Sequence, residues 1–224
     1  EAPSLMNQGK STGKVQSQIL KLKSDNKQVL NTQWQGVKSW NPEQPYLYQL
    51  TLTLLSPEGK ALHSITERIG FRTVELRRHD GLYINNVRVI AKGTNRHSFH
   101  PESGRTTSKA LSIQDAMLMK EMNMNAVRSH YPPDDHFLDV CDSLGLLYLD
   151  ELAGWQTHYD DTTALKQLKE MIVRDVNHPS VFMWSNGNEG GWNTTIDERF
   201  ADFDPQKRHV IHPWADFNGL DTNH

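Results

Sequence analysis

One acidic residue, Glu189, follows an apolar stretch in a setting that suits acid–base chemistry. Residues 181–184 read VFMW, and residues 185–193 read SNGNEGGWN. A short apolar run bounded by glycines is typical of a buried strand that ends in a turn. A carboxyl group at such a strand end has a rigid base, and a partly dry pocket can keep it protonated near neutral pH. Glu189 is therefore a candidate proton donor, with a surface glutamate in a turn as the alternative.

Four other apolar stretches also end in polar or aromatic residues. These end groups are Asn95, Arg96 and His97; Arg128 and His130; Asp150 and Glu151; and His212 and Trp214. A (β/α)₈ barrel builds its active site from the carboxyl ends of several strands around one axis. A nucleotide-binding sheet instead has a glycine-rich turn after its first strand, and KGTNRH at 92–97 has a single glycine. The positions of the polar residues favour a barrel.

Strands and amphipathic helices alternate after residue 86. We expect parallel strands near 88–94, 125–129, 146–150, 181–185 and 209–212, with helices such as 111–123 between them. Units of about 30 residues imply right-handed crossovers and a parallel sheet. Spacing alone permits a doubly wound sheet or a barrel. In the helix at 111–123, Ser112 and Asp115 have the spacing of a capping box.

The residues before about 75 have a different character. Residues 46–55 and 61–76 are rich in Val, Ile, Leu, Thr and Tyr and are separated by the turn signal SPEG. This pattern predicts a β-sandwich. We therefore place a partial immunoglobulin-like sandwich at 1–75 and the first part of a barrel, about five of eight strands, at 76–224.

Composition excludes several classes of partner. The chain has 224 residues, a net charge of -3 and both signs mixed along its length, so no basic stripe predicts nucleic acid. No apolar run approaches the ~18 residues that span a bilayer, and no signal-peptide pattern opens the sequence. The single cysteine, Cys141, lies among apolar residues of a predicted helix and is expected to be a buried core thiol.

Five ordered motifs resemble glycoside hydrolase family 2, which includes β-galactosidases, β-mannosidases and β-glucuronidases. They are GFRTVEL, LYINNVRVIAKGTNRHSFHP, MNAVRSHYPPDDHFLDVCDSLGLLYLDE, RDVNHPSVFMWSNGNEGG and HPWADFNGLD, and the resemblance covers about residues 40–224. Members of this family carry a jelly-roll domain, an immunoglobulin-like sandwich and a (β/α)₈ barrel. The resemblance implies a retaining exo-glycosidase, most like a β-galactosidase, acting on oligosaccharides or polysaccharides.

The resemblance also implies roles for single residues. Glu189 matches the acid/base, and Asn188 matches the residue that hydrogen-bonds the sugar 2-hydroxyl. His97 and His130 match histidines that line the pocket. Arg128 matches an arginine that helps to order the catalytic carboxylates, with a structural ion pair inside the barrel mouth as the alternative. Trp214 is a candidate to stack on a sugar face, together with Trp184 and Trp192, although Trp184 is expected in the core.

No cofactor is expected from these residues. A Glu-Thr-His stretch after the third strand helps to bind a divalent cation in β-galactosidases, and the matching stretch here is Gln156-Thr157-His158. The carboxylate is replaced, so a divalent cation is only the weaker alternative. DELAGWQ in place of the usual DEAN also weakens the implication of galactose specificity.

Retaining hydrolysis needs a second carboxylate, the nucleophile. In the family it lies beyond the sixth strand, so no residue here is assigned to it, and we expect the 224-residue piece alone to show no turnover. Two alternatives stay open: a carbohydrate-binding remnant without turnover, and another (β/α)₈ enzyme such as a metal-assisted hydrolase or an aldolase. A homo-oligomer of the full-length parent and a periplasmic or secreted location are compatible with the sequence, but no segment encodes either.

Overall fold

The computed structural model describes residues 17, 19, 29 and 31–213. The chain divides into two compact units, residues 1–38 and 39–224. The described residues of the first unit form neither helix nor strand. All elements below belong to the second unit. Among the residues that the structure describes, no helix is both long enough and apolar enough to cross a membrane.

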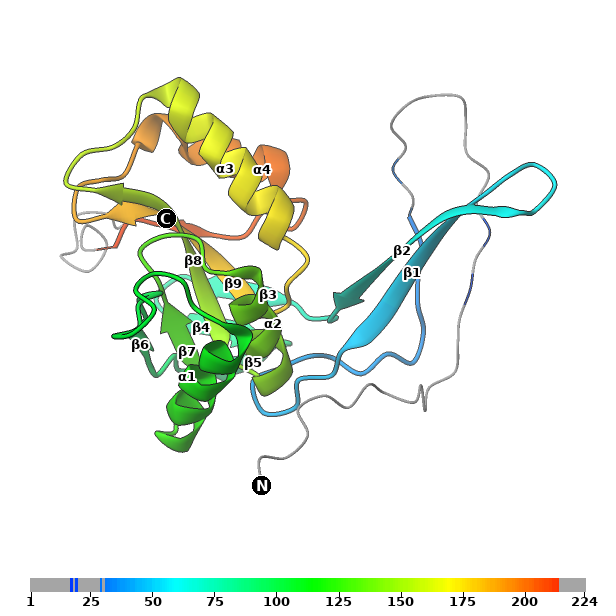
Figure 1. The fold of residues 1–224 in the computed structure, drawn as a ribbon, viewed down its shortest axis with the longest axis horizontal. Helices are drawn as coiled ribbons and strands as arrows, with labels where there is room; N and C mark the ends of the chain where they lie inside the picture. The colour runs from blue at the N-terminus through cyan, green and yellow to red at the C-terminus, as the bar shows by residue number, and fades with distance from the viewer. Residues whose placement is uncertain (1–16, 18, 20–28, 30, 214–224) are drawn as a thin grey trace. The chain divides into compact units, whose positions relative to one another are not determined.

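The described part of the predicted sandwich is a long antiparallel hairpin (Figure 1). Its strands are β1 (Tyr48–Leu55) and β2 (Ala61–Ile69), joined by the predicted turn. Side chains alternate between its faces: one carries cross-strand hydroxyl pairs such as Thr51–Thr66, at 3.0 Å, and the other carries the apolar pair Leu52–Ile65. This alternation is the pattern of a sheet with one face for a core and one for water.

A second antiparallel sheet was not anticipated. It consists of β3 (Val74–Arg77), β4 (Gly81–Ile84) and β5 (Val87–Val89). Asn85 and Asn86 both have positive φ, 50° and 67°, which turns the chain back within two residues. The prediction of one parallel strand over 88–94 was therefore wrong at its start, because residues 87–89 pair antiparallel with β4.

The five expected parallel strands form an open arc in the order β10-β9-β8-β7-β6. Their bounds are β6 (Gly93–Asn95), β7 (Ala126–Arg128), β8 (Leu147–Trp155), β9 (Val181–Asn188) and β10 (Val210–Ile211). All four neighbouring pairs are parallel. The fold is a sandwich segment followed by part of a (β/α)₈ barrel, whereas the boundary at residue 75 stays a prediction.

The helices cover one face of this arc and build the larger core. They are α1 (Lys109–Glu121), α2 (Asp135–Leu144), α3 (Asp161–Asp175), the 3₁₀ helix η1 (Thr194–Arg199) and α4 (Phe200–Phe203). Fully buried side chains from α2, β8, α3 and β9 meet in that core, among them Phe137, Tyr148, Leu168 and Trp184. Cys141 is buried there as expected, and burial raises the pKa of its thiol.

The sequence predicted the end of α2 correctly but not the start of α1. Gly145 ends α2 in the left-handed conformation, with φ 70°, as its position predicts. The N-cap of α1 is Ser108, whose hydroxyl accepts the Leu111 N–H, so the helix begins four residues before the predicted Ser112–Asp115 capping box, which was wrong. Ser112 lies inside the helix, where its buried hydroxyl pairs with His136 Nδ1 at 2.8 Å.

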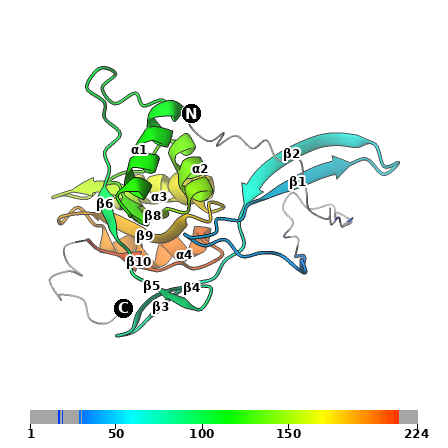
Figure 2. The same cartoon turned by 90° about the horizontal axis from the view of Figure 1, so that it is seen from below.

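The small sheet β3–β5 packs against the first residues of the parallel strands, on the side away from α1 and α2 (Figure 2). A second core forms there from Trp40, Ile84, Ala126, Leu147 and Phe182. This packing closes the amino-terminal end of the arc, so the carboxyl ends of the strands remain open for a site.

Candidate functional site

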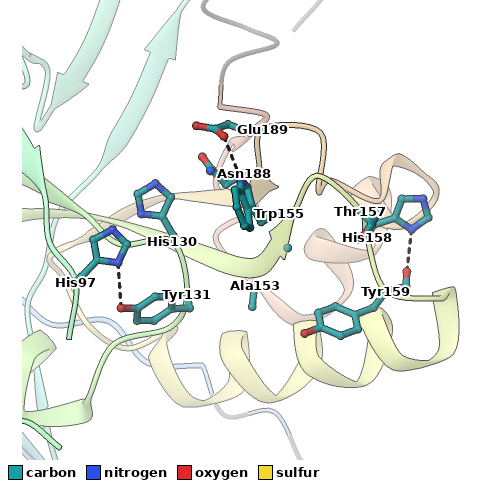
Figure 3. A pocket seen from close by; sticks show the side chains of 11 residues that line it. His97, His130, Tyr131, Ala153, Trp155, Thr157, His158, Tyr159, Asn188 and Glu189 are labelled. Carbon is teal, nitrogen blue, oxygen red and sulfur yellow. Dashed lines mark hydrogen bonds between the residues drawn. The ribbon is translucent and has the colours of Figure 1, made fainter. Parts of the chain in front are cut away.

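A cavity of about 660 Å³ lies at the carboxyl ends of the parallel strands (Figure 3). Its lining residues lie at the ends of β8 and β9 or follow β6, β7, β8 and β9, strands that are separate in sequence but adjacent in the arc. They are His97, His130, Tyr131, Ala153, Gly154, Trp155, Thr157, His158, Tyr159, Asn188 and Glu189. This is the face at which barrel enzymes assemble their active sites.

Glu189 is the first residue after β9 and is held in an unusual backbone conformation. Its φ is 45°, in the left-handed region that few side chains other than glycine, Asn and Asp adopt. The exposed carboxylate accepts a hydrogen bond from the indole N–H of Trp155, with Nε1 and Oε2 3.0 Å apart. A carboxylate that is exposed to the cavity and fixed by one donor can exchange a proton with a bound molecule.

Glycines bring the carboxyl ends of β8 and β9 unusually close. A Cβ on Gly154 would collide with the carbonyl oxygen of Gly191, and a Cβ on Gly191 would collide with the backbone nitrogen of Trp155. Gly187, at φ 79°, could not carry a side chain beside Gly191 either. Backbone contact between these segments therefore fixes Trp155 relative to Glu189.

Behind the cavity, Arg128 links two strand ends through hydrogen bonds. Its Nη2 donates to Asn188 Oδ1 at 2.8 Å, and its Nε donates to Glu151 Oε2 at 2.7 Å. Ser185 also donates to this oxygen of Glu151, at 2.7 Å. Because Arg128 engages the oxygen of the Asn188 amide, the NH₂ group of Asn188 is left as a hydrogen-bond donor.

Glu151 is fully buried inside the arc, and this burial has an electrostatic consequence. Its side chain has 0% exposure. Burial raises the pKa of Glu151 to about 7, although Arg128 and Ser185 oppose the shift. One oxygen, Oε1, is buried without a hydrogen-bond partner. The role of Glu151 that the geometry shows is to hold Arg128, and through it Asn188.

Two histidines stack on the opposite wall. The rings of His97 and His130 lie 4.8 Å apart and nearly parallel, at 6°. The Tyr131 hydroxyl accepts the Ser98 N–H at 3.1 Å and lies 3.2 Å from His97 Nδ1, so it can donate its own proton to that nitrogen. Burial, Arg128 and His97 lower the pKa of His130, which favours the neutral ring.

The structure thus brings four of the six predicted site residues to one cavity: Glu189, Asn188, His97 and His130. Arg128 lies behind them, in contact with Asn188. Trp214 falls outside the described residues. The chemical roles given to these residues stay predictions.

Several lining residues were missed by the sequence analysis. The most prominent are Trp155, Tyr131 and Tyr159. Trp155 was missed because β8 extends to residue 155, beyond the predicted end at 150, with a register shift between Leu152 and Trp155. The sequence GWQ could have identified Trp155, because it places an aromatic residue after a glycine at a strand end. Trp184, as expected, is buried in the core, where its indole donates to Asp204 at 2.8 Å.

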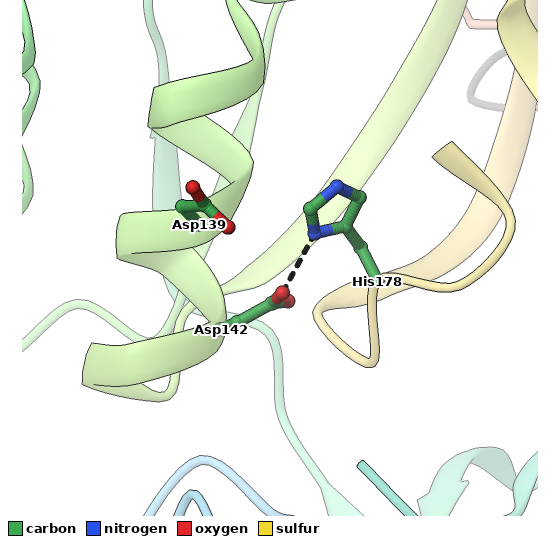
Figure 4. A group of neighbouring side chains, drawn as sticks. All are labelled: Asp139, Asp142 and His178. Atoms are coloured by element: carbon green, nitrogen blue, oxygen red, sulfur yellow. Dashed lines mark hydrogen bonds and ion pairs between the residues drawn. The ribbon is translucent and has the colours of Figure 1, made fainter. Parts of the chain in front are cut away.

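Metal-ligating side chains come together elsewhere. Within the part of the chain that the structure describes, Asp139, Asp142 and His178 form the one group with the right spacing (Figure 4). Their polar atoms are already engaged: Asp142 accepts His178 Nδ1 at 2.6 Å and the Ser180 N–H at 3.0 Å. Asp139 accepts Arg68 at 2.7 Å. These donors fit a hydrogen-bonded structural hub and not a metal ion.

Comparison with known proteins gives a consistent result over most of the chain. Residues 74–205 match the family described as "Glycosyl hydrolases family 2, TIM barrel domain", and residues 3–72 match "Glycosyl hydrolases family 2". A β-galactosidase of Lactococcus lactis is 41% identical over 170 residues, which are 70% of this chain and 17% of that protein. A putative β-glucuronidase of Formosa agariphila is 37% identical over 80% of this chain and 22% of that protein.

Solved structures show the same architecture. A β-glucuronidase from Ruminococcus gnavus in complex with D-glucuronic acid aligns with a TM-score of 0.72 and 28% identity, over 79% of this chain and 32% of that one. A β-galacturonidase from Eisenbergiella tayi bound to galacturonate aligns with a TM-score of 0.71 and 29% identity, over 77% and 34%. The chain spans about a fifth of the length of the two relatives compared by sequence.

Proposed function

Because this chain belongs to glycosyl hydrolase family 2, we propose that it forms part of a retaining exo-glycosidase that removes terminal sugars from oligosaccharides or polysaccharides. The observation that carries this proposal is the placement of Glu189 in the cavity, beside Asn188 and opposite the paired histidines. The sequence similarity to a β-galactosidase favours a β-galactoside as the substrate.

Glu189 is proposed as the general acid and base. In the first step it gives its proton to the glycosidic oxygen, which takes the electron pair of the breaking bond to the anomeric carbon. A second carboxylate, about 5 to 5.5 Å away, bonds to that carbon in a retaining enzyme. Among the described residues that line the cavity, Glu189 is the one carboxylate, so the nucleophile is assigned to a part of the parent protein outside them.

Asn188 and the histidines are proposed to hold the sugar. The NH₂ group of Asn188 faces the ligand because Arg128 occupies the amide oxygen, so Asn188 is a donor to the 2-hydroxyl. A neutral His130 can accept or donate a hydrogen bond to another hydroxyl. These contacts orient the anomeric carbon toward Glu189, and such positioning lowers the activation barrier.

The test is Glu189→Gln in the full-length parent. Turnover of a disaccharide is expected to fall by about 10²- to 10⁴-fold, the usual contribution of general acid catalysis. An aryl glycoside with an activated leaving group should lose much less in the glycosylation step, because its leaving oxygen needs no proton. Added azide should partly restore turnover of the aryl glycoside by replacing the base-assisted water.

Glu198→Gln is the matched control, because Glu198 is an exposed glutamate in η1 that does not line the cavity. It should keep wild-type rates. Wild-type rates of Glu189→Gln on the disaccharide would overturn the proposal. A wild-type parent that binds sugars but cleaves neither β-galactosides nor β-glucuronides would instead favour the carbohydrate-binding alternative.

A further inference from the structure

The cavity has two halves with the Trp155–Glu189 pair between them (Figure 3). His97, His130 and Tyr131 lie on one side of Trp155, and residues 157–159 lie on the other. Only the first half is used by the proposed sugar contacts. The second half has aromatic and polar side chains that the mechanism above does not use.

We propose that this second half, with Trp155 as its platform, is the subsite that binds the leaving sugar. The inference rests on the proposed function and extends it. An acid that protonates the departing oxygen must lie beside the bond that breaks. A flat side chain that is hydrogen-bonded to this acid, on the side away from the residues that hold the terminal sugar, then lies next to the leaving group.

Trp155 has the exposure and the attachment of a stacking platform. It is 63% exposed in the described part of the chain although it lies at the end of a strand, and it lines the cavity. Its Nε1–H is used on Glu189 Oε2, which anchors the indole edge and leaves the ring as the binding surface. Flat aromatic rings match the apolar face of a pyranose, and Trp offers the largest such surface.

The segment that follows Trp155 is held in place before any ligand binds. Asn193 Nδ2 donates to the Tyr159 carbonyl at 3.3 Å and to the Asp161 carboxylate at 2.8 Å. Thr157 bridges back to Trp155 through its backbone N–H, at 2.7 Å. The two Asn193 bonds tie residues 159–161 to the connection after β9 that carries Glu189, and the Thr157 bond closes a turn back to Trp155. Because this segment is already ordered, it loses little conformational entropy when a sugar binds.

The experiment compares two substrates of the full-length parent that differ only in the leaving group. One is a disaccharide, and the other is the glycosyl fluoride of the same terminal sugar, which has no leaving ring. Trp155→Ala should raise KM for the disaccharide about five- to tenfold, the size expected for one lost stacking contact. KM for the fluoride should change less than about twofold. Trp155→Phe keeps a flat ring and should retain most of the affinity for the disaccharide.

A second readout uses the return reaction. A sugar that occupies the leaving-group subsite can accept the glycosyl unit in place of water. With the fluoride as donor and free glucose as acceptor, Trp155→Ala should lower the ratio of transfer to hydrolysis several-fold, whereas Trp155→Phe should not. A purely structural role of Trp155 would lower both rates together and leave this ratio unchanged.

Phe99→Ala is the matched control, since Phe99 is an aromatic residue of similar exposure, 66%, that does not line the cavity. If Trp155→Ala behaves like Phe99→Ala in both readouts while the wild-type parent cleaves both substrates, the subsite is wrong and the proposed function stands. If the wild-type parent cleaves neither substrate, the proposed function itself fails.

Discussion

Polar and charged side chains at the two ends of the parallel sheet differ in their hydrogen-bond partners. At the amino-terminal end, Asp142 is fully buried and accepts hydrogen bonds from His178 and the Ser180 N–H, and the Trp40 indole donates to its backbone carbonyl. Arg72 donates to the carbonyl of Pro179 at the same end. These charged groups have partners and close a core, although Ser180 Oγ and Arg208 Nη1 are buried at the same end without one.

At the carboxyl end, several groups lack such partners. Glu151 Oε1 and His130 Nδ1 are buried without a hydrogen bond, and Glu189 and Gln156 have φ values of 45° and 61°. Strained backbone and unpaired polar atoms cost stability, and they persist where they serve a function. The buried Asp142 hub therefore closes a core at one end of this sheet, whereas Glu189 and its neighbours face a cavity at the other, the end at which barrel enzymes bind their substrates.

The largest loss of stability is expected from a change at the amino-terminal end of the sheet, which we call the stable end. Asp142→Ala leaves His178 and the Ser180 N–H unpaired in a buried site, so the free energy of unfolding should fall by about 3 to 5 kcal/mol. Turnover per folded molecule should stay at the wild-type level, because the hub is remote from the cavity. Chemical denaturation and activity of the parent measure the two quantities.

Asp142→Asn is the matched control, since the amide keeps one acceptor and should lose less stability. A large loss of turnover by folded Asp142→Ala would contradict the separation between the two ends.

The next effect is a dependence of stability on pH that differs between the ends. Burial raises the pKa of Glu151 from 4.5 to about 7, so the folded state binds more protons than the unfolded state in this range. Stability should therefore fall as pH rises from about 4.5 to about 7, by at most about 1.4 kcal/mol per pH unit. Glu151→Gln should flatten the curve in this window.

His178 affects the stability of the fold in a different pH range. Its burial lowers its pKa, but the bond to Asp142 and nearby carboxylates outweigh this and raise the pKa above 6.5. The stabilisation is therefore complete below pH 6.5 and is lost as pH rises through the folded-state pKa. His178→Gln should flatten the curve above pH 6.5 and leave its slope between about pH 4.5 and 6.5 unchanged. If either variant altered the other's window, the two ends would be coupled.

The smallest expected effect is at the rim of the stable end. Arg68 donates to the Asp139 carboxylate at 2.7 Å and to Ser143 Oγ at 2.9 Å, but both charged side chains are partly exposed. Arg68→Met should cost only about 1 kcal/mol, because exposed ion pairs are screened by water. A loss as large as that of Asp142→Ala, in the same denaturation assay, would show that the stable end depends on its rim as much as on its buried hub.

The sequence predicted most of the elements and part of the site. Apolar stretches and amphipathic helices repeat with regular spacing, and this local pattern placed the strands that became β7, β8, β9 and β10. The polar residues after these strands, including Glu189 and His130, indicated the open end of the sheet. Such patterns can be read locally because each element needs one apolar face for the core.

The contacts that shape the site could not be predicted in this way. The left-handed Asn85–Asn86 pair diverts residues 87–89 into a separate sheet, a pairing that depends on β4. The resemblance implied that Arg128 orders carboxylates, but it did not identify Glu151 and Asn188 as its two partners, because these residues meet only when three strands lie side by side.

The local sequence pattern was enough to predict that alternating strands and helices would present Glu189 at a strand end. It could not show that β8 runs on to Trp155 and brings its indole to the Glu189 carboxylate. The physical reason is that this contact depends on two backbones touching at Gly154 and Gly191. A contact between two segments that are far apart in the chain produces no periodic pattern in the sequence of either segment.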